Sequence, residues 1–95
     1  MNDTSAISRA ARIAALLRAN FGPAEIQVVD DSHRHAGHSG AAPGGETHYT
    51  ITVVSKSFAG LGRVARQRAV NAALEHEFAT GLHALSMKLQ APGEG

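Results

Sequence analysis

The stretch Thr47-His48-Tyr49-Thr50-Ile51-Thr52-Val53-Val54 carries the clearest structural pattern in this 95-residue chain. Its large apolar side chains, Tyr49, Ile51 and Val53, alternate with threonines. Alternation with a period of two predicts a strand that has one buried face and one wetter face. A strand of this kind must pack its apolar face against a second layer, so the segments on either side should supply that layer.

The segment before this strand predicts a helix followed by a shorter strand. Capping oxygens at Asp3, Thr4 and Ser5 favour a helix that runs to about Asn20 and ends at Gly22-Pro23. Apolar residues recur there at helical spacing. They are Ile7, Ala10, Ile13, Ala14, Leu16, Leu17 and Phe21. Residues 25–30 then contain three β-branched residues, which favours a strand.

The segment after the central strand predicts one long helix and a last strand. A helix is expected from Arg63 to about Thr80, with Gly81 just past its end and a short helical turn before it near Leu61. Its apolar stripe would comprise Val64, Val70, Leu74 and Phe78. Residues 84–90 alternate again and predict a strand.

Together these elements predict one α+β domain of two layers, with the order α-β-β-α-α-β, a mixed three-stranded sheet and helices on one face. The first two strands are expected to be antiparallel neighbours. The domain should span residues 5–91, between a flexible N-terminus (1–4) and a flexible tail (92–95).

Composition narrows the class of protein. The formal net charge is only +1, so no strong overall field favours binding to nucleic acid or membrane. There is no cysteine, so this chain alone can build neither a disulfide nor a thiolate metal site. It shows no secretory leader and no apolar run of membrane-spanning length. We therefore expect a cytoplasmic protein without membrane contact, a monomer or weak homodimer. Without a nucleophile beside a base or a phosphate-binding loop, an enzyme is not expected.

Histidines supply the main candidate metal ligands, because imidazole is the commonest protein metal ligand. His33, His35 and His38 lie in a polar, glycine-rich loop over residues 31–45. They could form part of a zinc site, which needs about four ligands, or simply belong to a solvated loop. His83 stands where a helix has ended and a strand begins, so it is either a structural histidine or a ligand on a rigid element. One rigid and one mobile histidine would form half of a metal site.

A basic segment supplies a second candidate surface. Lys56, Arg63, Arg66 and Arg68 cluster there and could meet phosphates or an acidic partner, although such a run can also be a solvated face. The two remaining histidines, His48 and His76, are expected on the surface.

Several blocks of the chain, in order, resemble the BolA family from about Ser5 to Pro92. They are Val28-Val29-Asp30-Asp31-Ser32, Gly45-Glu46-Thr47-His48-Tyr49, Val53-Val54-Ser55 with Phe58 and Gly60, Arg66-Gln67-Arg68-Ala69-Val70, and His83-Ala84-Leu85-Ser86. The loop is similar to that of the branch common in alphaproteobacteria. The resemblance implies a class II K-homology fold.

The resemblance also implies a partnership with a monothiol glutaredoxin, in which the two proteins share a [2Fe-2S] cluster. The glutaredoxin and glutathione would supply thiolates, and the BolA-like chain would supply histidine, which can replace thiolate on one iron. The family ligand in the last-strand motif corresponds to His83. The loop ligand corresponds to His35 when residues are counted from Asp31-Ser32 at the start of the loop. It lies nearer to His38 when they are counted back from Gly45-Glu46-Thr47-His48. No cluster is expected in the isolated chain.

Nucleic-acid binding is the alternative that the resemblance raises. Gln67 stands between Arg66 and Arg68 where many members carry histidine, which leaves the two cationic positions in place. The chain lacks the Gly-x-x-Gly loop that clamps RNA, because Gly60 and Gly62 are only one residue apart. A DNA-binding transcriptional regulator using the helix from Arg63 to Arg68 is therefore the alternative function. A stand-alone metal-binding module is a third.

Overall fold

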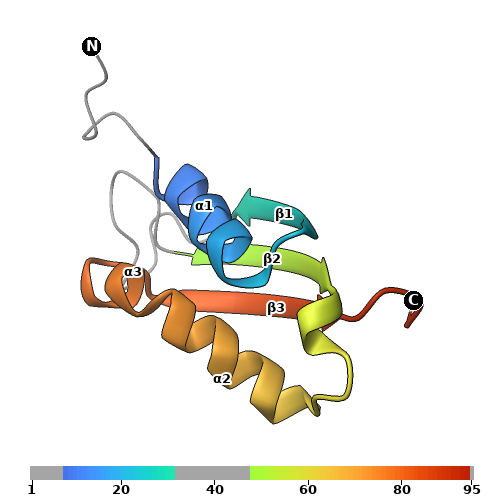
Figure 1. Cartoon of the computed structure of the whole chain (residues 1–95). Coiled ribbons are helices and arrows are strands. Elements are labelled where there is room, and N and C mark those ends of the chain that lie inside the picture. Colours follow the sequence, from blue (N-terminus) through green and yellow to red (C-terminus); the bar gives the residue numbers. More distant parts are fainter. Residues whose placement is uncertain (1–7, 32–47, 95) are drawn as a thin grey trace.

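A computed structural model describes residues 8–31 and 48–94 of the chain. Figure 1 shows its elements in chain order. They are α1 (Arg9–Phe21), β1 (Ala24–Asp30), β2 (His48–Ser55), the 3-10 turn η3 (Lys56–Phe58), α2 (Arg63–Ala73), α3 (Glu75–Ala79) and β3 (Ala84–Gln90). The predicted α+β class and the order α-β-β-α-α-β are confirmed.

The three strands form one mixed sheet in the order β1-β2-β3. β1 pairs with β2 antiparallel, in a register that sets Asp30 against Tyr49. β2 pairs with β3 parallel, with His48 against Ala84. Because parallel neighbours need a crossover, α2 and α3 return the chain to the end of the sheet at which β2 began (Figure 1).

The core lies between the sheet and the helices. Tyr49, Ile51 and Val53 of β2 are buried, as the alternation predicts, whereas the residues between them are half-buried. They join a single apolar cluster with residues from α1, η3 and α2. The helical members of this cluster with the lowest exposure are Ile13, Leu17, Phe58, Val70 and Leu74.

The start of α1 differs from the prediction. The N-cap is Ser8, whose hydroxyl accepts a hydrogen bond from the amide of Ala11 at 3.1 Å. The expected caps, Asp3, Thr4 and Ser5, lie outside the described residues. Several capping residues stand close together in this segment, and the spacing of apolar residues alone does not select among them.

The long helix predicted from Arg63 to Thr80 is two helices, because the backbone leaves helical geometry at Leu74. Val64 does not share the buried stripe and is 57% exposed. It precedes Val70 by six residues, which places it about 120° around an α-helix from the buried face. The short helical turn lies at Lys56–Phe58 instead of near Leu61.

The segment after β3 turns back on itself in the residues that the structure describes, whereas the flexibility predicted for residues 92–95 stays a prediction. Ala91 is buried, and its amide donates to the Glu94 carboxylate at 2.9 Å. The amide of Glu94 in turn donates to the carbonyl of Ala91, at 3.2 Å. Gly93 makes this turn possible with a φ of 88°, a conformation that glycine adopts without strain.

Candidate functional site

Two histidines lie side by side where β2 and β3 begin; we call this place the histidine end. His48 is the first residue of β2, and His83 immediately precedes β3. Their rings stack with centroids 6.0 Å apart and an interplanar angle of 15°. His83 is exposed and His48 is half-buried. The prediction of His83 on a rigid element is therefore consistent with the fold, and its environment is open rather than enclosed.

The segment that carries the predicted loop ligands is attached at this same end. The chain leaves the described part after Asp31 and re-enters at His48, and the amide of Asp31 donates to the carbonyl of His48 at 2.8 Å. The hydroxyl of Thr50 donates to the Asp31 carboxylate, which fixes that side chain to β2. His33, His35 and His38 themselves lie outside the described residues.

The turn that leads into His83 is anchored by a buried charge. Glu77 is 1% exposed, and its carboxylate meets Arg9 at 2.8 Å and Arg12 at 3.2 Å, both on α1. Arg9 also donates to the carbonyl of Thr80 at 2.9 Å, and the amide of Leu82 donates to the carbonyl of Glu77 at 2.9 Å. These contacts tie residues 77–82 to α1 and so fix where β3 starts.

Gly81, within this turn, has a φ of 128°, which a residue with a side chain adopts only with strain. A Cβ at this position would also meet Nη2 of Arg9 at 3.0 Å. The direction of the chain into His83 therefore depends on a glycine at position 81.

The histidine end does not form a complete metal site from the residues described. In residues 8–31 and 48–94, no group of three or more His, Cys, Asp or Glu side chains is placed to hold an ion. Two adjacent imidazoles, one of them exposed, can donate nitrogen to a metal whose other ligands come from elsewhere. With no cysteine in the chain, any thiolate must come from a second molecule.

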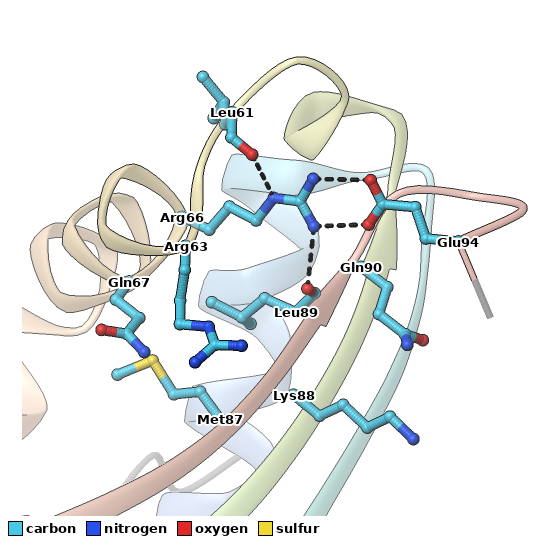
Figure 2. A pocket seen from close by; sticks show the side chains of 9 residues that line it. All are labelled: Leu61, Arg63, Arg66, Gln67, Met87, Lys88, Leu89, Gln90 and Glu94. Atoms are coloured by element: carbon cyan, nitrogen blue, oxygen red, sulfur yellow. Dashed lines mark hydrogen bonds and ion pairs between the residues drawn. The ribbon is translucent and has the colours of Figure 1, made fainter.

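The basic segment divides into residues with different surroundings. Arg66 of α2 is held on three sides (Figure 2). Its Nε donates to the carbonyl of Leu61 at 2.8 Å, Nη1 donates to the carbonyl of Leu89 at 3.1 Å, and both terminal nitrogens meet the Glu94 carboxylate at 2.6 and 2.8 Å. The guanidinium also lies 5.9 Å from the centre of the Phe58 ring.

The other predicted cations are more exposed, and among them only Arg63 shares a cleft with Arg66. Arg63 is exposed and shares a cleft with Arg66, whereas Arg68 is exposed and does not line that cleft. Residues two apart on a helix do not face the same way, which explains the separation of Arg66 and Arg68. Lys56 lies on η3, in a shallower depression beside Pro23 and Pro92.

The fold and the site define a small α+β domain that offers paired histidines at the start of two parallel strands. Comparison with known proteins agrees. The sequence model described as BolA-like protein matches residues 17–94. An uncharacterized protein from a Sinorhizobium species, encoded in a cobS 5' region, is 47% identical over 78% of this chain and 81% of its own length. The chain therefore belongs to the BolA family.

Other relatives extend this result. The chloroplastic protein BOLA1 of Arabidopsis thaliana is 41% identical over 98% of this chain, which spans 60% of that relative's length. The BolA domain of SufE1 from the same plant superposes with a TM-score of 0.83 at 39% identity, covering 94% of this chain and 98% of that domain. A Vibrio cholerae protein named as the DNA-binding transcriptional regulator BolA is 42% identical over 70% of this chain and 59% of its own length. In the described ranges, no helix is long and apolar enough to cross a bilayer.

The position of His48 beside His83 was not predicted, because His48 was expected to be an ordinary surface residue. The available signal was topological: in a parallel pair that starts together, the first residue of β2 lies beside the residue before β3. Glu94 was also missed, because a carboxylate that pairs with an arginine 28 positions away leaves no local pattern.

Proposed function

We propose that this chain is the BolA-like partner of a monothiol glutaredoxin and donates histidine to a [2Fe-2S] cluster that the two proteins share. Its role would lie in iron–sulfur cluster trafficking or in the regulation of iron homeostasis. The observation that carries the proposal is an exposed His83, stacked on His48, at the end of the sheet to which the segment with His35 and His38 is attached.

The donor set fits a shared cluster better than a site of this chain alone. The described residues supply imidazole without a third ligand, and the chain has no thiolate. When bound, the cluster would supply the redox and transfer chemistry, with potential raised by imidazole ligation. His83 would bind one iron, and His35 or, as its substitute, His38 would supply the second nitrogen.

The part of His48 in this proposal is to orient its neighbour. A ligand works best when its ring is already held in a productive direction, and stacking against His48 restricts the rotation of the His83 ring. The Glu77 ion pairs act one step further away, by fixing the turn from which His83 projects.

The test is to mix the chain with a cluster-loaded monothiol glutaredoxin and glutathione, and to record visible absorption and circular dichroism. The wild-type chain should change the cluster spectrum, and His83→Ala should abolish the change. His76→Ala is the matched control, since His76 is an exposed histidine on α3 and should leave the change intact. An unaltered wild-type spectrum, or a full change with His83→Ala, would contradict the proposal.

Single His35→Ala and His38→Ala variants then identify the second ligand. The variant that lacks the true ligand should give a different dichroism spectrum, whereas the other should match the wild type. If both match, and the double variant matches as well, the ligand does not come from these two positions.

DNA binding by α2 is the second candidate function, favoured by the name of the Vibrio cholerae relative and by the exposure of Arg63 and Arg68. Phosphate contacts make affinity fall steeply with salt. Replacing Arg63 and Arg68 together by glutamine should lower the slope of log affinity against log salt by about 2. An unchanged slope would count against this function. Arg66 is the weakest of the three as a phosphate contact, because it is already paired with Glu94.

A further inference from the structure

A cleft between α2 and the end of β3 lies apart from the histidine end. It has a volume of about 570 Å³, within the usual range for ligand sites. Its residues come from the connector before α2, from α2, from the second half of β3 and from the segment after β3 (Figure 2). We call it the arginine cleft. It lies about 20 Å along β3 from His83, given the rise of a strand per residue.

The arginine cleft carries an excess of positive charge. Arg63, Arg66 and Lys88 line it, against Glu94 as the one carboxylate among its lining residues. Figure 2 shows Arg63 and Arg66 both reaching from α2 toward β3. The guanidinium of Arg63 makes no hydrogen bond or ion pair with any described residue. The one carboxylate among the lining residues therefore pairs with Arg66 alone, which leaves the charge of Arg63 for a second acidic group.

Arg66 is held in place without Glu94. The carbonyls of Leu61 and Leu89 accept two of its hydrogen bonds, and the Phe58 ring lies beside its guanidinium. The remaining N–H groups point together in the fork geometry that matches a carboxylate. The site is therefore preorganised by main-chain groups and a buried ring, and the carboxylate is its exchangeable part.

The Glu94 carboxylate, which binds the terminal nitrogens of Arg66, is held less firmly than Arg66 itself. Glu94 belongs to an exposed turn, and its side chain keeps 42% of its surface accessible, against 13% for that of Arg66. Apart from Arg66, the structure gives its carboxylate one partner, the amide of Ala91. Because the Glu94 side of this ion pair faces solvent, an external carboxylate that also gains apolar contacts in the cleft can compete for the Arg66 guanidinium.

The rest of the cleft favours a peptide over a nucleic acid. Leu61, Met87 and Leu89 offer apolar surface, and β3 is an edge strand of the sheet. None of the described residues that line the cleft is aromatic, and the nearby ring of Phe58 is fully buried and unavailable for base stacking.

We propose that the arginine cleft binds an acidic, partly apolar peptide segment of a partner protein, whose carboxylate replaces Glu94 on Arg66 and is shared with Arg63. In the free chain, Glu94 occupies the position of that carboxylate. The chain thus carries its own competitor, and the apparent affinity for the segment is reduced by the fraction of molecules in which Glu94 is bound.

The experiment titrates the ¹⁵N-labelled chain with a short capped peptide that has one glutamate between two leucines, and follows the Arg66 side-chain Nε–H and the amides of β3. Glu94→Gln should bind this peptide about tenfold more tightly than the wild type, because the internal competitor is gone. Arg63→Gln, added to Glu94→Gln, should weaken binding again. Arg68→Gln is the matched control on the same helix and should not.

Three outcomes of the peptide titrations would overturn the proposal. They are an absence of binding to Glu94→Gln, equal binding of the same peptide with glutamine in place of glutamate, and an equal loss of affinity from Arg68→Gln and Arg63→Gln. Inorganic phosphate and a short DNA duplex are run as further probes. If either gives the same shifts at the same concentration, the cleft is a general anion site and the peptide assignment is wrong. Glutaredoxin-dependent cluster spectra of Glu94→Gln should match the wild type, since the histidine end is untouched.

Discussion

The two ends of β3 differ in how their polar side chains are satisfied. At the histidine end, His48 and His83 stack, and the described residues supply no third ligand. In the arginine cleft, Arg66 finds two carbonyls and a carboxylate within the same chain. Among the described residues, one end therefore holds two imidazoles without further ligands, whereas the other end gives its arginine partners on three sides. The two proposals therefore differ in kind. At the histidine end a second molecule would add metal ligands, whereas in the arginine cleft an external carboxylate would compete with Glu94 for Arg66.

The two ends also depend on different anchors. The histidine end depends on a buried ion pair between α3 and α1, through Glu77 and Arg9. The arginine cleft depends on the buried ring of Phe58, which packs against Phe21 with centroids 5.1 Å apart and supports Arg66. Two substitutions test these anchors and a third tests the Glu94 ion pair, from the largest expected effect to the smallest.

Removal of the Phe58 ring should have the largest effect. Phe58 is fully buried, and truncating a buried phenylalanine leaves a cavity that costs about 4 kcal/mol of the free energy of unfolding. Urea denaturation of Phe58→Ala measures this loss. Leu61→Ala is the control at the same end, because Leu61 is 39% exposed and should change stability by no more than about 0.5 kcal/mol. Equal losses for the two variants would show that the ring is not the anchor.

Neutralising Glu77 should destabilise the protein by about 3 kcal/mol, because it leaves Arg9 and Arg12 facing a buried position without its negative charge. Glu77→Gln keeps the size of the side chain, so the measurement isolates the charge. Glu75→Gln is the control on the same helix, where the side chain is exposed. Urea denaturation with no greater loss for Glu77→Gln than for Glu75→Gln would contradict the proposed anchor.

The smallest effect is expected from Glu94→Gln, and it should depend on pH. The hydrogen bond from Arg66, followed by that from the Ala91 amide, lowers the pKa of Glu94 from 4.5 to about 2. A carboxyl whose pKa is lower in the folded state stabilises that state above its unfolded pKa, and the stabilisation is lost as pH falls toward the folded pKa. Thermal melts of wild type and variant should therefore differ by a constant amount above about pH 5 and converge toward pH 2. A difference that persists at the lowest pH would contradict this account.

The sheet was the most predictable part of the fold. Alternation in residues 47–54 and 84–90 matches β2 and β3 within one residue at each end, because a strand with one buried face imposes its period on the sequence. His83 could be placed before β3 for the same reason. The helices were less predictable at their ends, since the break at Leu74 and the cap at Ser8 depend on contacts with other elements.

The remaining features of the two sites depend on contacts between distant parts of the chain. Arg9 and Glu77 are 68 positions apart, and Arg66 and Glu94 are 28 apart. The helical and strand periods describe neighbours within one element, so they carry no information about such pairs. The same limit explains why the pairing of Arg66 with Glu94 was not predicted.

The glycine at position 81 has a consequence for how this domain tolerates changes in length and composition. A side chain there would be strained by the backbone and would press on Arg9, so the turn before β3 has essentially one acceptable residue. An insertion of one residue between this turn and β3 would shift the alternation of the strand and turn its buried residues toward solvent. Gly62 is the contrasting case, because its φ is −74° and an added Cβ there meets no atom within 4 Å, so a side chain should be tolerated at that position.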